Sequence, residues 1–96
     1  MMRVSAGIVR YPDERILICR RGEGRKNAHL WEFPGGKQEA GESPEDALRR
    51  ELLEELSLPI ADISPLCRRE AQGIAFDFLT ATATRAPVLT LSLIHI

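Results

Sequence analysis

The sequence predicts an α/β (α+β) domain with one amphipathic helix. Three observations support this prediction: a capped helical segment over residues 44–56, two strand-like runs before it and two more after it. With 96 residues, 44% of them hydrophobic and 28% charged, the chain has an ordinary globular composition and can bury one modest core. It contains no internal repeat or low-complexity tract, so we expect a single domain.

Local signals predict the bounds of the helix. Ser43 can cap the first N–H groups, Pro44 suits the first helical position, and Asp46 follows the cap by three residues, as in a capping box. No glycine or proline follows Pro44 until Pro59, so we expect a helix from Pro44 to Leu56.

The predicted helix has two distinct faces. At about 100° per residue, Leu48, Leu52 and Leu56 form an apolar stripe. A separate arc carries Arg50 and three carboxylates, those of Glu51, Glu54 and Glu55. These carboxylates are three and four residues apart, so they repel one another, and one arginine cannot neutralise all three. A hard divalent cation can, and an all-oxygen ligand set favours Mg²⁺ or Mn²⁺ over Zn²⁺. The alternative is a solvated acidic helix face.

The spacing around this helix is similar to a known signature. Gly36, Glu42 and residues 50–58 (RELLEELSL) resemble the signature of the Nudix hydrolase family, and residues 30–37 (LWEFPGGK) look like the approach to it in the MutT-like branch. The chain departs from the pattern at Ser57, where the family has a left-handed glycine, and serine there costs about 1 kcal/mol. The resemblance implies a mixed β-sheet on which the signature loop and helix pack.

The resemblance also implies a role for individual residues. Glu51, Glu54 and Glu55 would be the catalytic metal ligands, and Glu51 would also orient or deprotonate the attacking water. The Gly35 carbonyl would be a further ligand, because glycine lets the backbone approach an ion. Structural support would come from Gly36, Glu42 and Arg50, and substrate contacts from Arg21 and Phe33. Trp31 and Phe33 could each stack on a base, with core packing as the alternative for either.

The implied reaction is metal-assisted hydrolysis of a pyrophosphate bond. With Mg²⁺, or Mn²⁺ as a substitute, a nucleoside triphosphate would give a nucleoside monophosphate and pyrophosphate. Related nucleoside diphosphate derivatives are also family substrates, and the sequence leaves open which nucleotide is cleaved, oxidised ones such as 8-oxo-dGTP included. The alternatives are a catalytically silent Nudix-fold nucleotide-binding module, an inactive fragment, and an acidic interaction helix on a small scaffold.

Strands are predicted on both sides of the helix. Residues 4–10 and 15–20 flank a turn-forming cluster and predict one hairpin; residues 63–71 and 74–84 flank Gln72-Gly73 and predict another. On the second pair we expect Glu70 and Asp77 to be exposed. Cys19 and Cys67 lie in apolar surroundings without CxxC spacing, so both are expected to be buried thiols.

Charge and hydropathy limit the partners. A net charge of −1 argues against a general binder of nucleic-acid polymers, and no segment predicts export or a membrane span. We expect a cytoplasmic protein with a nucleotide substrate. Its oligomeric state is open, with a homodimer as one option.

The last six residues look foreign to the domain. Residues 91–96 (LSLIHI) can be encoded by CTG TCT CTT ATA CAC ATC, the transposon end used as an adapter in DNA library preparation. We therefore hypothesise a non-native tail at 91–96 and an incomplete domain at 1–90, without the C-terminal strand and helix usual in the family. A short apolar terminal strand is the alternative, and the source nucleotide sequence decides between them.

Overall fold

The computed structural model describes residues 1–20, 31–85 and 93–95. Its elements in chain order are β1 (Met2–Arg10), β2 (Leu17–Arg20), β3 (Trp31–Glu32), β4 (Gly35–Lys37), α1 (Pro44–Leu56), β5 (Ala61–Ala71), β6 (Ile74–Thr82) and β7 (Leu93–His95). Arg21, one of the two expected substrate contacts, lies outside the described residues.

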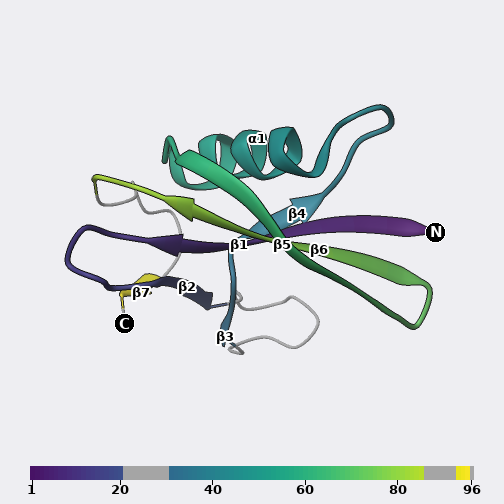
Figure 1. The fold of residues 1–96 in the computed structure, drawn as a ribbon, viewed down its shortest axis with the longest axis horizontal. Coiled ribbons are helices and arrows are strands. Elements are labelled where there is room, and N and C mark those ends of the chain that lie inside the picture. The colour runs from purple at the N-terminus through teal and green to yellow at the C-terminus, as the bar shows by residue number, and fades with distance from the viewer. Residues whose placement is uncertain (21–30, 86–92, 96) are drawn as a thin grey trace.

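The strands form two sheets (Figure 1). The larger has the order β4-β1-β6-β5, and the smaller has the order β3-β2-β7. β1 runs parallel to β6, from the pair Met2↔Ile74 to the pair Arg10↔Thr82, whereas β4 and β5 are antiparallel to their neighbours. The larger sheet is therefore mixed, and the predicted α/β (α+β) class is confirmed.

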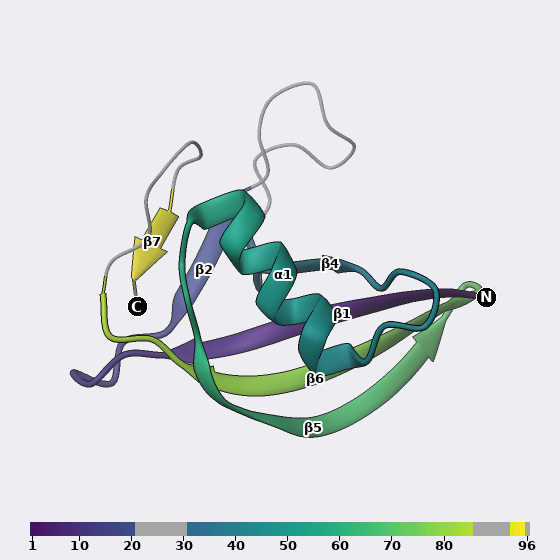
Figure 2. The same cartoon turned by 90° about the horizontal axis from the view of Figure 1, so that it is seen from above.

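Helix α1 covers one face of the mixed sheet, and Figure 2 shows it lying over β1. The core between them contains the predicted apolar stripe of the helix together with Val9, Leu17 and Leu79. Burial of each leucine contributes about 1.5–3 kcal/mol. A Cβ atom at Gly7 would lie 2.9 Å from both Leu48 methyl carbons, so glycine at this position lets the helix pack closely on β1.

Both ends of α1 agree with the prediction. The Ser43 side chain accepts a hydrogen bond from the Asp46 N–H at 3.1 Å, and Pro44 begins the helix. At the other end Ser57 is left-handed, with φ 49° and ψ 37°. Its N–H donates to the Leu53 carbonyl, and the N–H of Leu58 donates to the Leu52 carbonyl. A non-glycine residue therefore occupies the strained terminator position.

The first predicted hairpin is wrong. A turn joins β1 to β2 through a hydrogen bond from the Tyr11 N–H to the Arg15 carbonyl, but the pairing here in the described residues is limited to an isolated bridge between Arg10 and Ile16, the residue before β2. β6 occupies one edge of β1 along its whole length and β4 pairs with Val4–Ala6 on the other edge, whereas β2 pairs with β3 and β7 in the smaller sheet.

The second hairpin is confirmed, since β5 and β6 pair antiparallel around Gln72-Gly73. Two expectations within it are wrong. Cys67 is exposed because β5 is the edge strand of its sheet, while Cys19 is buried as expected. Asp77 is only 8% exposed, because it lies on the face of β6 that α1 covers and is held there by polar partners.

The C-terminal segment contains a short strand. β7 pairs antiparallel with β2, with Leu17 opposite His95. A short terminal strand was the alternative to an adapter-encoded tail. The adapter origin of residues 91–96 stays a prediction. In the described part of the chain, no helix has the length and apolar character needed to cross a membrane.

Candidate metal and nucleotide site

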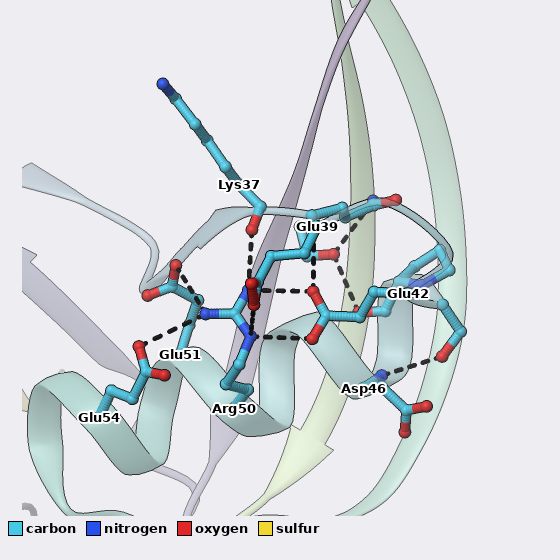
Figure 3. A network of polar contacts seen from close by, with 11 residues as sticks. Lys37, Glu39, Glu42, Asp46, Arg50, Glu51 and Glu54 are labelled. Atoms are coloured by element: carbon cyan, nitrogen blue, oxygen red, sulfur yellow. Dashed lines mark hydrogen bonds and ion pairs between the residues drawn. The ribbon is translucent and has the colours of Figure 1, made fainter.

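Glu42 and Arg50 connect the loop of residues 38–43 to helix α1. The two Glu42 oxygens accept from Arg50 Nε at 2.8 Å and Nη2 at 3.0 Å, and Oε1 also accepts from the Glu39 N–H at 2.9 Å (Figure 3). Arg50 Nη2 further donates to the Lys37 carbonyl at 3.0 Å. This two-pronged geometry attaches the loop to the helix, as the resemblance implies for this pair.

Arg50 lies among four carboxylates. Its guanidinium nitrogens are 3.1 Å from Glu39, 2.8 Å from Glu42, 3.5 Å from Glu51 and 3.4 Å from Glu54 (Figure 3). One positive charge against four negative charges leaves a formal charge of −3 in this cluster. The exposed side chain of Glu55 adds a fifth carboxylate next to Glu51 on the helix.

The surroundings shift the pKa values of Glu42 and Glu51 in opposite directions. The hydrogen bond from Arg50, helped by the Glu39 N–H, lowers the pKa of Glu42 to about 2. Burial raises the pKa of Glu51 above its ordinary value, and Glu55 and Glu54 add to this rise, while Arg50 opposes it. Glu42 is thus fully compensated as an anion, whereas Glu51 is an anion that its surroundings disfavour.

Two glycines make space around Glu51 and the sheet edge. A Cβ atom at Gly36 would overlap the Glu51 carboxylate, so the absent side chain lets this carboxylate lie against β4. Gly35 has φ 153°, and a Cβ atom there would overlap the Ser5 backbone oxygen. Both positions therefore require glycine for a physical reason, the first for the carboxylate and the second for the backbone.

The Gly35 carbonyl points away from β1. Hydrogen bonds join Gly7 to Pro34 and Gln38 to Arg3, so the pair Ala6↔Gly35 between them is one whose N–H and C=O groups face outward. Lys37 lies two residues after Gly35 on β4, so its carbonyl faces outward as well, and it accepts a hydrogen bond from Arg50. The Gly35 carbonyl oxygen is therefore available as a metal ligand on the open edge of β4.

The three helix glutamates do not converge on one ion position: no group of three or more His, Cys, Asp or Glu in residues 1–20, 31–85 and 93–95 is arranged to hold a metal. Glu51 and Glu54 both turn toward Arg50 Nη1, because a guanidinium attracts them while they repel each other. The donor set itself fits a hard cation, since it consists of carboxylates and a backbone carbonyl with an uncompensated negative charge.

The aromatic residues before β4 are on the surface. Trp31 is 44% exposed and Phe33 is 41% exposed, so core packing is wrong for both. Sequence reasoning missed Glu39, which meets Arg50 at 3.1 Å. Its spacing of three residues from Glu42 in the same acidic loop was the available signal.

A sequence model of the NUDIX domain matches residues 1–85. The chain belongs to the Nudix family. Its Nudix fold is shared with a solved structure of MutT from Aliivibrio salmonicida and Vibrio cholerae, with a TM-score of 0.86 and 32% identity over 99% of this chain and 78% of that one.

Curated MutT-like Nudix relatives match a part of the chain. The 8-oxo-dGTP diphosphatase of Haemophilus influenzae is 48% identical over 58 residues, 60% of this chain and 43% of the relative. The 8-oxo-dGTP diphosphatase of Escherichia coli is 44% identical over 57 residues, 59% of this chain and 44% of the relative. The CTP pyrophosphohydrolase of Escherichia coli is 47% identical over 58 residues, 60% of this chain and 42% of the relative. The chain thus spans less than half the length of these relatives.

Proposed function

We propose that this Nudix chain cleaves a pyrophosphate bond in a nucleoside triphosphate or a related nucleoside diphosphate derivative, with Mg²⁺ or Mn²⁺ as the cofactor. The products from a triphosphate are a nucleoside monophosphate and pyrophosphate. The observation that supports this best is the cluster in which Arg50 faces four carboxylates and leaves a formal charge of −3. The relatives named as 8-oxo-dGTP diphosphatases favour an oxidised purine triphosphate as substrate.

In this proposal Glu51, Glu54, Glu55 and the Gly35 carbonyl hold the divalent cation. When bound, the cation neutralises the polyphosphate and lowers the pKa of a coordinated water. The space at Gly36 lets the Glu51 carboxylate lie beside β4, on the edge where the Gly35 carbonyl faces outward. Carboxylates and a carbonyl at one edge are the donors that such a cation prefers.

The chain's own residues orient the reactants. Glu51 accepts the proton of the attacking water, because burial makes its carboxylate more basic than an exposed one. Glu42 and Arg50 keep the loop against the helix that carries Glu51. Phe33 offers an exposed aromatic face to a base, and Arg21 contacts the phosphates.

The test is Glu54→Gln. Glu54 is 59% exposed at its side chain, so the amide removes a ligand without disturbing the core. We expect the parent to release pyrophosphate with Mg²⁺ and the variant to release none at an unchanged Tm. Glu70→Gln is the matched control, since it removes an exposed carboxylate on β5 and should leave turnover intact.

Other outcomes identify the alternatives. Binding of Mg²⁺ and nucleotide by the parent without any product indicates a silent binding module. Absence of metal affinity above the millimolar background indicates an acidic interaction helix. A panel of an oxidised purine triphosphate, a pyrimidine triphosphate, a nucleotide sugar and a dinucleoside polyphosphate then separates the substrate classes.

We propose further that the protein acts in the cytoplasm on small nucleotides rather than on nucleic-acid polymers. The net charge of −1 and the free thiols of Cys19 and Cys67 support this proposal. Size-exclusion chromatography with light scattering distinguishes a monomer from a homodimer.

A further inference from the structure

A buried polar network lies beneath the loop of residues 38–43. Ser5 is 0% exposed and Asp77 is 8% exposed, although both carry polar side chains. They lie on the face of β1 and β6 that α1 covers. Buried polar groups require partners, and the partners here come from the loop, from the first residue of α1, from β5 and from β1 itself.

Ser5 joins the two ends of this loop. Its hydroxyl donates to the Pro44 carbonyl at 2.9 Å and accepts from the Gln38 side-chain amide at 3.2 Å. The Gln38 N–H also donates to the Arg3 carbonyl at 2.8 Å. The residue that begins the loop and the residue that follows it are therefore tied to one hydroxyl on β1.

Asp77 holds the side chain of Gln38, the first residue of the loop. Its Oδ2 accepts from Gln38 Nε2 at 2.7 Å, and its Oδ1 accepts from Arg68 Nε at 2.7 Å. Arg3 lies 3.7 Å from Oδ2. The hydrogen bonds from Arg68 and Gln38 keep the pKa of Asp77 below its ordinary value against the effect of burial, so the carboxylate only accepts hydrogen bonds. An acceptor at this place orients the Gln38 amide with both N–H groups directed to Asp77 and Ser5.

The loop carries the groups that hold Arg50. Glu42 accepts from the Glu39 N–H, the Glu42 N–H donates to the Glu39 carbonyl at 3.0 Å, and both side chains meet Arg50 (Figure 3). Arg50 in turn contacts Glu51 and Glu54. A contiguous set of contacts thus runs from Asp77 through Gln38 and the loop to the glutamates of the site.

We propose that Asp77 is a positioning residue, which fixes the loop of residues 38–43, and through it the Glu42–Arg50 pair, by holding Gln38 against Ser5. Asp77 touches neither Arg50 nor the helix glutamates in any contact of the described residues, so it acts only through Gln38. The effect on metal binding and turnover rests on the proposed function, whereas the effect on the loop does not.

Two variants separate this role from ordinary stabilisation. Gln38→Ala and Arg68→Ala each remove one hydrogen bond of 2.7 Å to the same Asp77 carboxylate, but only Gln38 belongs to the loop. Amide hydrogen exchange at Glu39 and Glu42 reports on the loop directly. We expect roughly five- to tenfold faster exchange there in Gln38→Ala, the effect of one or two lost hydrogen bonds, and no change in Arg68→Ala. Exchange within β5 and β6 should stay at the parent value in Gln38→Ala.

Asp77→Ala supplies the second measurement. It should accelerate exchange at Glu39 and Glu42 by up to the factor seen in Gln38→Ala, which also removes the hydrogen bond to Ser5, and the double variant should exchange no faster than Gln38→Ala, because Asp77 acts on the loop only through Gln38. Mn²⁺ affinity measured by calorimetry should fall by up to about tenfold in Gln38→Ala and Asp77→Ala and stay at the parent value in Arg68→Ala.

The outcomes distinguish the two proposals. Unchanged exchange at Glu39 and Glu42 in Gln38→Ala, or equal acceleration in Arg68→Ala, overturns the positioning role of Asp77 whatever the activity. Accelerated loop exchange in Gln38→Ala and Asp77→Ala alone supports that role, even when the parent protein binds no Mn²⁺ and hydrolyses no nucleotide. In that case it is the proposed function that fails.

Discussion

The Glu51 carboxylate occupies the space that a Cβ atom would fill at Gly36. At this point the helix approaches the edge strand β4 with a charged side chain, at a residue of the strand that has no side chain. This contact brings the proposed metal-binding arc beside the Gly35 carbonyl. Its removal should affect the site far more than the fold.

Gly36→Ala tests this separation. The added methyl group meets the end of a side chain, which can rotate away, so we expect stability to change by less than about 0.5 kcal/mol. Displacement of Glu51 should lower Mg²⁺-dependent turnover by about 10- to 100-fold. Gly35→Ala is the contrasting variant, because its methyl group meets the Ser5 backbone at φ 153° and should cost about 1–3 kcal/mol. Urea denaturation and pyrophosphate release measure the two effects, and a stability loss in Gly36→Ala equal to that in Gly35→Ala would contradict the assignment.

Ser57→Gly should stabilise the protein. Ser57 is left-handed at φ 49°, where glycine avoids a penalty of about 1 kcal/mol. We expect a higher urea midpoint with an unchanged slope and unchanged turnover. Ser57→Ala keeps the left-handed penalty and should stay within about 0.5 kcal/mol of the parent. Equal midpoints for the glycine and alanine variants would show that this turn is unstrained.

Glu51→Gln should raise Tm at neutral pH without divalent metal while lowering turnover by about 10²–10⁴-fold. Burial raises the pKa of Glu51 in the folded protein, so its ionisation opposes folding. The cost is absent below the unfolded pKa and appears as pH rises through the folded pKa. The gain in Tm should therefore vanish in acid. Glu54→Gln removes an exposed charge from the same arc and should leave Tm unchanged. A fall in Tm for Glu51→Gln at pH 7 would refute the burial argument.

Glu42→Gln should make stability less sensitive to acid. The pKa of Glu42 is lowered to about 2, so this group stabilises the fold above its unfolded pKa, near 4.5, and the contribution is lost as pH falls toward 2. The variant should unfold at lower urea than the parent at pH 7 and show a flatter stability profile between pH 4.5 and pH 2. Glu39→Gln changes the more exposed partner of Arg50, 64% exposed against 15% for Glu42, and should alter the profile less.

Features encoded locally were predictable from the sequence. Ser43, Pro44 and the absence of breakers before Pro59 predict the observed bounds of α1, because caps act on the nearest turn. The β5–β6 hairpin follows from Gln72-Gly73, since both turn residues have positive φ. The Glu42–Arg50 contact was predictable because the spacing of these residues resembles a family signature.

Features that depend on distant partners were not predictable. β1 pairs with β6 rather than β2, and no local pattern distinguishes these options, since the pairing is decided by which strand reaches each edge of β1. From the sequence Asp77 is predicted to be exposed, because its partner Gln38 is 39 positions away. Cys67 reads as buried because its apolar neighbours do not reveal that β5 is an edge strand.

The parallel pairing of β1 with β6 also affects how the chain folds during synthesis. Met2 pairs with Ile74 and Arg10 with Thr82, so β1 meets its central neighbour only after some seventy further residues have been translated. Contacts of such long sequence separation slow folding, and until they form β1 exposes unpaired backbone N–H and C=O groups along its edge. The nascent protein therefore depends on prompt completion of translation, and pauses before β6 should increase its need for chaperones.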